Sequence, residues 1–320
     1  MKYALDELGS LIKKIKLPIE TNNPDIRYIC SLMAELAYCQ VSEDEFDTLN
    51  RAKVIPCQIY KSILEARKTT NIALAFGADG GDNTFVAVDR SVVSIGYKIE
   101  NYLFVAFRGT SFLYDWLINF RINPVSIKSY NYFFNYKNKY SKYLIKSHYG
   151  LYHSGFAEEA LRISLIISEK YHKLFEGVEH VFYSGHSLGG AIAAISAALL
   201  PNSTTYSIHI IGAPRYCDVS AYYSNLMDVP VQIMRRGDIV PFVPPRCFGY
   251  ADHPIQTDTQ GVQFKDRKTS SSISYLIWTS MLFLRLAAKP HAIDLYRREL
   301  GKTANAKMAT APLVDLDKIR

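Results

Sequence analysis

Apolar side chains recur at steps of three and four residues in three segments of the chain, and this spacing predicts helices. The first segment is 26–39, where the apolar positions fall on one helical face. The second is 156–175, and the third is the alanine-rich run 191–200. We expect these three segments to cover a sheet.

Short runs rich in β-branched and aromatic residues separate these helices and predict strands. Two come early, at 85–89 and 102–109, and the turn-forming segment 98–101 between them indicates a hairpin that feeds a central strand. Three more runs alternate with helical segments: 178–185, 206–214 and 229–238. Such alternation is typical of an α/β protein whose mostly parallel sheet is joined by crossover helices.

The composition indicates an ordinary globular chain. Of the 320 residues, 48% are hydrophobic and 13% aromatic, which is too apolar for a disordered protein. We find no internal repeat and no low-complexity linker, and a chain of this length can bury roughly 75% of its unfolded surface in one core. We therefore expect a single domain over 1–320, with an N-terminal flank at 1–25 and a C-terminal tail at 301–320.

The net charge of +7 is partly localised. Within 122–150, lysines alternate with tyrosines and form a basic, tyrosine-rich insertion. Lysine with aromatic residues suits single-stranded nucleic acid or the headgroup level of an anionic membrane, while a solvated surface insertion needs no partner. Among partners, an anionic membrane or lipid-droplet surface fits better, so we expect no nucleic acid; protein partners are not indicated.

The segment 271–288 is almost free of charge and borders on transmembrane length. Ser274, Thr279, Ser280 and Arg285 dilute it, so we expect a buried or interfacial helix rather than a membrane span.

The cysteines and the N-terminus bear on location. An odd number of cysteines, with no two-residue spacing, indicates neither a disulfide framework nor a zinc site. Asp6 and Glu7 interrupt the apolar run that a Sec-type signal needs. We expect a cytoplasmic protein, or one exported without a cleaved N-terminal signal, with peripheral membrane association as a further option.

The first candidate chemistry lies between a predicted strand and the helix at 191–200. There, Gly185, Ser187 and Gly189 form the pattern G-x-S-x-G, which holds a nucleophilic serine on a sharp turn. The flanking residues must be tiny because strand and helix approach closely there. His186, beside the serine, is expected to face away from the nucleophile.

A serine nucleophile needs a base, and the base needs an orienting acid. In this architecture the acid and the histidine follow the serine in that order. Asp238 ends a predicted strand and is the stronger acid candidate; Asp228 precedes that strand and is the weaker one. His291 lies late enough for a strand and a helix to intervene, so we favour it as base over His253, which follows Asp238 closely.

The tetrahedral intermediate of acyl transfer needs two hydrogen-bond donors. The amide of Leu188, directly after the nucleophile, is the first. Thr110, at the end of the strand 102–109, offers its amide and hydroxyl as the second.

Together these motifs resemble the class 3, or fungal-type, lipase family. The resemblance covers roughly residues 26–300 and is carried by seven segments: ELAYC at 35–39, FRGT at 107–110, HSGF at 153–156, GHSLGGA at 185–191, GAPR at 212–215, GDIVPFVPP at 237–245 and the Pro-His pair ending at His291. Asp115, Trp116 and Asn119 match as well. Several motifs in the correct order are far more specific than one.

The resemblance implies an α/β-hydrolase fold with a mostly parallel central sheet, flanking helices and a lid helix. It assigns nucleophile, acid and base to Ser187, Asp238 and His291, and the oxyanion donors to Thr110 and Leu188. It places the lid just after FRGT, where four apolar residues recur at helical spacing: Leu113, Trp116, Leu117 and Phe120. A simple packed helix would show the same spacing.

The function implied is a serine carboxylic-ester hydrolase acting on lipid esters such as triacylglycerol, through an acyl-enzyme and without metal or organic cofactor. Phospholipase A1 or a short-chain carboxylesterase is the alternative within catalysis, because the motifs do not reveal the acyl pocket. A lipase-like scaffold that binds lipid or protein without turnover is the alternative of another class.

Overall fold

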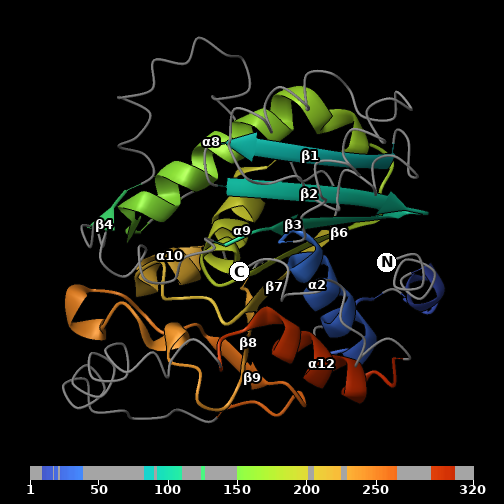
Figure 1. Cartoon of the computed structure of the whole chain (residues 1–320). Coiled ribbons are helices and arrows are strands. Elements are labelled where there is room, and N and C mark those ends of the chain that lie inside the picture. The colour runs from blue at the N-terminus through green and yellow to red at the C-terminus, as the bar shows by residue number, and fades with distance from the viewer. Residues whose placement is uncertain are drawn as a thin grey trace, which may run out of the picture.

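The computed structural model is built around one seven-stranded sheet (Figure 1), with the order β1-β2-β3-β6-β7-β8-β9. The residues that it describes are 9–16, 18–20, 22–38, 83–89, 92–109, 124–126, 150–200, 205–224, 229–264 and 290–306. The strands are β1 (Thr84–Asp89), β2 (Val92–Ile99), β3 (Tyr102–Phe107), β6 (His180–His186), β7 (Thr205–Ile211), β8 (Val231–Met234) and β9 (Ile255–Asp258).

The sheet is mostly parallel. Strands β3, β6, β7, β8 and β9 pair in parallel, and only β1 and β2 run antiparallel to their neighbours. Antiparallel pairs need only a short turn, whereas parallel pairs need a crossover, and helices supply those crossovers. The α/β fold class with a mostly parallel central sheet is confirmed.

The early hairpin differs from the sequence prediction. The sequence predicts two strands there, but the structure has three: β2 fills most of the interval between the two predicted strands and includes the first two residues of the predicted turn at 98–101. Gly96 interrupts the β-branched pattern of β2 and hides it. A Cβ atom at Gly96 would lie 1.9 Å from the Phe85 ring, so the aromatic ring on β1 requires a glycine opposite it.

Helices cover both faces of the sheet (Figure 1). On one face lie α8 (Ser154–Tyr171), followed by the 3₁₀ helix η2 (His172–Phe175), and α9 (Leu188–Leu199). On the other lie α2 (Pro24–Leu36) and α12 (Ile293–Thr303), which pack against each other. The three predicted helices correspond to α2, α8 with η2, and α9.

Strand β3 shows how the two cores are divided. Leu103, Val105 and Phe107 contact the cluster under α8 and α9, whereas Phe104 and Ala106 contact the cluster under α2 and α12. All five side chains are buried, because alternate residues of a strand point to opposite faces. A central strand buried on both faces is therefore apolar throughout.

The segments predicted as flank, insertion and tail are partly described. In the N-terminal flank, Leu11, Ile12 and Ile15 are buried in the cluster under α2 and α12. Helix α12 extends to Thr303, into the predicted tail. A two-stranded ladder of β4 (Pro124–Val125) and β5 (Tyr152–His153) brings the two ends of the predicted insertion together, while residues 127–149 lie outside the described part.

Shorter elements join β7, β8 and β9. They are α10 (Val219–Ser224) and the 3₁₀ helices η3 (Val240–Phe242) and η4 (Arg246–Phe248).

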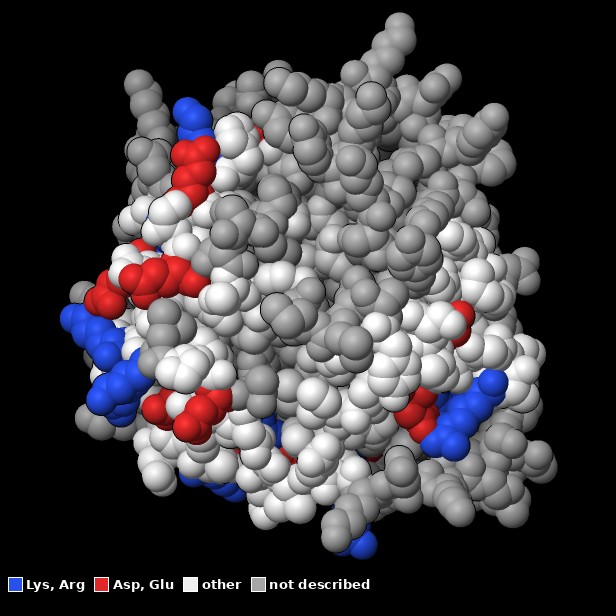
Figure 2. All heavy atoms as spheres, turned by 180° about the vertical axis from the view of Figure 1, so that it is seen from behind, with Lys and Arg blue, Asp and Glu red and all other residues white. Residues whose placement is uncertain are grey.

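Among the described residues, no helix has both the length and the apolar character that a membrane crossing requires. The apolar segment 271–288 lies outside those residues. On the face seen in Figure 2, the described acidic and basic side chains sit close to one another near the margin.

Candidate active site

Ser187 stands at the junction of β6 and α9. Its backbone has φ 58° and ψ −131°, a left-handed conformation that a residue with a Cβ atom rarely adopts. A Cβ atom at Gly185 would lie 2.2 Å from the Gly189 carbonyl oxygen, and one at Gly189 would lie 2.2 Å from the Phe107 carbonyl oxygen. The turn therefore has the tight geometry that the glycine pattern predicts.

Leu188 is the first residue of α9, and Ser187 is its N-cap. The first amide groups of a helix have no helical carbonyl partner, and they lie at the positive end of the helix dipole. The Ser187 side chain makes no capping hydrogen bond, so its hydroxyl is not used to hold the helix end. The other oxyanion candidate, Thr110, lies outside the described residues, as do Leu113, Trp116, Leu117 and Phe120.

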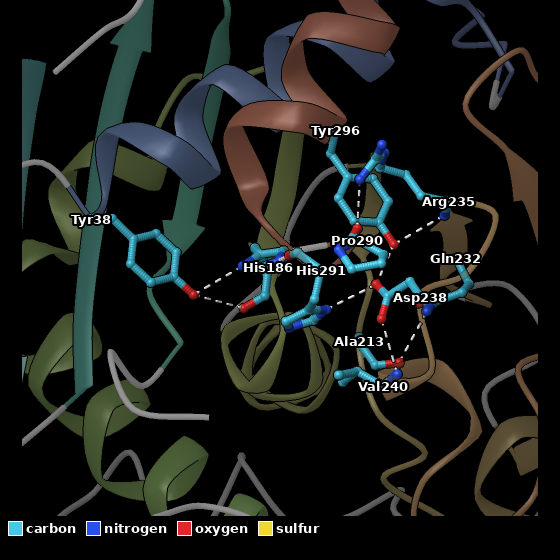
Figure 3. Close-up of polar contacts among 10 residues, drawn as sticks. All are labelled: Tyr38, His186, Ala213, Gln232, Arg235, Asp238, Val240, Pro290, His291 and Tyr296. Carbon is cyan, nitrogen blue, oxygen red and sulfur yellow. Dashed lines mark hydrogen bonds and ion pairs between the residues drawn. The ribbon is translucent and has the colours of Figure 1, made fainter. Parts of the chain in front are cut away.

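Asp238 and His291 are 53 positions apart in the chain, but their side chains are hydrogen-bonded to each other in the structure. Asp238 comes after β8, and His291 comes just before α12. The Nδ1 atom of His291 lies 2.8 Å from Oδ2 of Asp238, and both side chains are buried (Figure 3). A carboxylate oxygen accepts, so Nδ1 of His291 carries the proton of this hydrogen bond, and Nε2 is the ring nitrogen left to act as a base.

The Asp238 carboxylate is held by two further donors. The hydroxyl of Tyr296, in α12, donates to Oδ2 at 2.5 Å, and the amide of Val240 donates to Oδ1 at 3.0 Å. The Tyr296 oxygen in turn accepts from the amide of Arg235 at 3.0 Å. Burial and the charge of Asp238 raise the pKa of Tyr296 well above its ordinary value, so the hydroxyl keeps its proton and remains a donor.

The backbone around His291 is also anchored. The guanidinium of Arg235 donates to the Pro290 carbonyl oxygen at 2.6 Å and is paired with Glu299. Gly212, with φ +54°, leaves space for the pair: a Cβ atom there would lie 2.8 Å from Asp238 Oδ2 and 3.2 Å from His291 Cε1. Within the described residues, the buried Nε2 of His291 has no hydrogen-bond partner.

The rejected candidates lie elsewhere. His253 is buried, and its Nδ1 atom lies 2.8 Å from the hydroxyl of Tyr222 in α10 rather than near a carboxylate. Burial, together with the charge of Arg215, lowers the pKa of His253 to about 3. Asp228 lies outside the described residues. Of the two histidine candidates, only His291 contacts Asp238.

Sequence analysis missed several residues that the structure brings to this site. Tyr296 is five residues past His291, but it looks like an ordinary core position of a helix. Gly212 and Tyr38 belong to the motifs GAPR and ELAYC, which we used only as marks of resemblance. Our prediction for His186 was that it faces away from the nucleophile, and it did not include the packing of this ring against that of His291, with 4.5 Å between the two ring centroids. These residues reach the site through contacts between elements that are far apart in the chain, and no local sequence pattern indicates those contacts.

The described residues contain no group of three or more His, Cys, Asp or Glu side chains that could hold a metal ion.

Comparison with known proteins finds one matching family model and several similar lipases. Residues 104–248 match the family model of lipase (class 3). Lipases of Rhizopus niveus and Rhizopus oryzae are each 36% identical to this chain over 96 residues, which is 26% of this chain and 24% of the relative. The match thus spans about a quarter of the length of these curated relatives.

Solved lipase structures are similar as well. One is a triacylglycerol lipase whose catalytic centre is described as a serine protease triad, with 18% identity, coverage of 73% of this chain and 79% of that chain, and a TM-score of 0.46. Another is the Lip2 lipase of Yarrowia lipolytica, with 19% identity, coverage of 73% and 77%, and a TM-score of 0.47.

Proposed function

Because residues 104–248 match the model of the class 3 lipase family, we propose that this protein is a serine ester hydrolase that acts on lipid esters. The observation that carries the proposal is the buried Asp238–His291 pair, which leaves His291 Nε2 without a partner among the described residues. Ser187 supports it, because its strained turn begins a helix whose first amides are unpaired by the helix itself.

In the proposed mechanism, Ser187 attacks the ester carbonyl carbon while Nε2 of His291 takes the hydroxyl proton. Asp238 holds the Nδ1–H group and stabilises the imidazolium that forms. The amides of Leu188 and Thr110 donate to the oxyanion. The imidazolium then protonates the leaving alcohol and the acyl-enzyme forms. His291 next deprotonates a water, which attacks the acyl carbon. The bond from that carbon to Ser187 Oγ then breaks, the imidazolium returns its proton to Oγ, and the carboxylic acid leaves.

The nucleophile is tested by hydrolysis of esters graded from acetyl to long acyl chains, with emulsified triacylglycerol and phospholipid vesicles alongside. Ser187→Ala is the blank, and we expect it to lower kcat by about a million-fold. Activity that is largest on triacylglycerol supports a lipase. Activity confined to vesicles supports phospholipase A1, and activity confined to soluble esters supports a short-chain esterase. Absence of Ser187-dependent turnover on every substrate would leave only the lipase-like binding scaffold.

The base is tested by two matched variants. His291→Ala should lower kcat about as far as Ser187→Ala, because the members of a triad act as a unit. His253→Ala removes a buried histidine that is bound to Tyr222, and the folded variant should retain kcat. Full activity in the first variant with loss in the second would overturn the assignment of the base.

The lid and the membrane surface belong to the same proposal. A rate that rises sharply when long-chain substrate forms an interface would support the lid assigned to Leu113, Trp116, Leu117 and Phe120. For the basic, tyrosine-rich insertion at 122–150, we propose peripheral binding to anionic lipid, in the cytoplasm or after export without a cleaved signal. Flotation with anionic vesicles at low and high salt tests this, and binding that ignores lipid charge and salt would count against it.

A further inference from the structure

His186, the residue before Ser187, contacts two distant segments of the chain. Its Nε2 atom lies 2.7 Å from the His291 carbonyl oxygen, 105 positions along the chain. Its Nδ1 atom lies 3.0 Å from the hydroxyl of Tyr38, just after α2 (Figure 3). The side chain is buried, and its ring lies 4.5 Å from the ring of His291. The mechanism above uses neither Tyr38 nor His186.

These contacts determine the direction of each hydrogen bond. A carbonyl oxygen only accepts, so Nε2 of His186 carries a proton and donates to His291. Burial and the nearby His291 lower the pKa of His186 well below its ordinary value, so the ring is neutral and Nδ1 is bare. Nδ1 therefore accepts a hydrogen bond from the Tyr38 hydroxyl.

The chain of hydrogen bonds continues to the end of β3. The amide of Gly109 donates to the Tyr38 oxygen at 3.0 Å. A Cβ atom at Gly109 would lie 2.5 Å from that oxygen and 2.8 Å from the His186 carbonyl oxygen, so this close approach requires a glycine. Gly109 directly precedes Thr110, the proposed second oxyanion donor. The bonded series is thus Gly109, Tyr38, His186 and His291.

We propose that Tyr38 and His186 are positioning residues that couple the oxyanion end of β3 to the backbone of the catalytic base. They touch no substrate and act through Gly109 and His291. The inference rests on the proposed function. Oxyanion donors and a base must both be placed to a fraction of an ångström relative to the nucleophile, and a misplacement of 1 Å can cost about 100-fold in rate. A hydrogen-bonded connection between the oxyanion end of β3 and the backbone of the base therefore affects the chemical step rather than substrate binding.

Three variants test the proposal in the full chain. Tyr38→Phe removes one hydroxyl from the middle of the series. His186→Phe keeps an aromatic ring beside His291 but removes both nitrogen atoms. His186→Gln replaces both ring nitrogens with one carboxamide: its N–H group can donate to the His291 carbonyl in place of Nε2, and its oxygen can accept from the Tyr38 hydroxyl in place of Nδ1. Kinetics are measured on the best ester substrate of the wild-type protein, well below the unfolding temperature of each variant.

We expect Tyr38→Phe and His186→Phe to lower kcat by about 10- to 100-fold with KM changed by less than about threefold. His186→Gln should recover most of the lost kcat. The double variant Tyr38→Phe with His186→Phe should lose little more than His186→Phe alone, because both changes break one series. An additive loss would overturn the coupling.

Tyr171→Phe is the matched control for Tyr38→Phe. Tyr171, at the end of α8, donates to the Val86 carbonyl oxygen at 3.0 Å, a bond of the same kind on the other face of the sheet. This variant should lower the unfolding temperature but keep the wild-type kcat. If Tyr38→Phe behaves in the same way, Tyr38 only holds the fold and the proposal is wrong.

The outcomes separate this inference from the proposed function. If the wild-type protein shows Ser187-dependent turnover and kcat is retained in Tyr38→Phe and in His186→Phe, only the inference fails. If the wild-type protein shows no such turnover, the proposed function fails and the inference fails with it. Should His186→Phe not fold, Tyr38→Phe and His186→Gln still decide, because Tyr38→Phe must lose kcat and His186→Gln must keep most of it.

Discussion

On one face of the central sheet, α8 and α9 bury only uncharged side chains, whereas on the other face α2 and α12 bury Arg27, Glu35 and Arg297. On the second face, Arg297 pairs with Glu35 and joins α12 to α2. Arg27 donates to the hydroxyl of Thr257 at 3.1 Å and also to the Asp258 carbonyl. Burial lowers the pKa of Arg27 to about 10, although Asp258 opposes the shift.

The two faces deliver different parts of the candidate site. The α8–α9 face carries Ser187 at the start of α9, where glycines let strand and helix approach. The α2–α12 face carries Tyr38 after α2, and His291 and Tyr296 at the start of α12. Apolar packing is non-directional, while hydrogen bonds and ion pairs prescribe an orientation. We infer that the directional contacts of α12 fix its orientation and thereby that of His291, the proposed base, just before it.

Among the variants that compare the two faces, the largest expected effect separates catalytic chemistry from packing. Asp238→Asn should lower kcat by about 10⁴-fold, since an amide does not hold His291 in the required tautomer. Its matched control is Asp89→Asn, which breaks a 2.6 Å ion pair with Arg162 of α8 on the opposite face. The control should retain kcat, measured on the same ester. Equal losses in the two variants would remove the functional distinction between the faces.

The second effect concerns the buried ion pair. Glu35→Leu or Arg297→Met alone should lower the free energy of unfolding by about 3–5 kcal/mol, because each breaks the ion pair and leaves the opposite charge buried. The double variant should recover most of that loss. Urea unfolding measures all three.

The opposite face provides the comparison for this cycle. Ile163→Ala in α8 and Ile195→Ala in α9 should each lose about 2–5 kcal/mol, because each leaves a cavity. Their double variant should lose more than either single variant. Recovery of stability in the Ile163–Ile195 double variant, or no recovery of stability in the Glu35–Arg297 double variant, would contradict the contrast between the faces.

The third effect is a pH dependence that arises from one buried histidine. His209 of β7 is buried near Arg27 and His180, and burial first, then these two charges, lower the pKa of His209 to about 3. In the unfolded chain, this histidine has an ordinary pKa of ~6.5 and binds a proton that it does not bind in the folded protein. The free energy of unfolding therefore falls as the pH drops below ~6.5. Between pH 6 and 4 this residue should cost about 1.4 kcal/mol per pH unit.

The variant His209→Leu removes that term. Its unfolding free energy should therefore fall less steeply with decreasing pH than that of the wild-type protein, by about 1.4 kcal/mol per unit. Ile163→Val, on the other face, should change the free energy of unfolding without changing its pH slope. An unchanged slope in His209→Leu would show that His209 is already charged in the folded protein.

The smallest effect is at a helix end. The Asn23 side chain caps α2 and accepts from the amides of Asp25 and Ile26 at 2.9 and 3.3 Å. Asn23→Ala should cost about 1 kcal/mol, and Asn23→Asp should cost much less, because aspartate caps equally well. Thermal unfolding of the two variants measures this. A loss in Asn23→Asp as large as that in Asn23→Ala would mean that the amide side chain has a role beyond capping.

Local sequence patterns predicted much of the fold. Helices α2, α8 and α9 follow from apolar spacing, and the alternation of strands and helices predicted a mostly parallel sheet. Strand β2 was missed because Gly96, placed there by the Phe85 ring of the neighbouring strand, breaks the local pattern. Helix α12 gave only a weak apolar pattern, because Arg297 is buried against Glu35 and a charged residue looks exposed in sequence.

By itself, the sequence determined the turn around Ser187, because tight glycine turns and helix starts are local features of the chain. It also ordered the candidates for acid and base, and the resemblance to a family narrowed them. Only the tertiary structure decided which histidine contacts Asp238, and that Tyr296, Tyr38 and His186 support the pair. Those contacts join residues that are far apart in the chain, so their geometry depends on the order of the strands in the sheet and on the packing of α2 against α12.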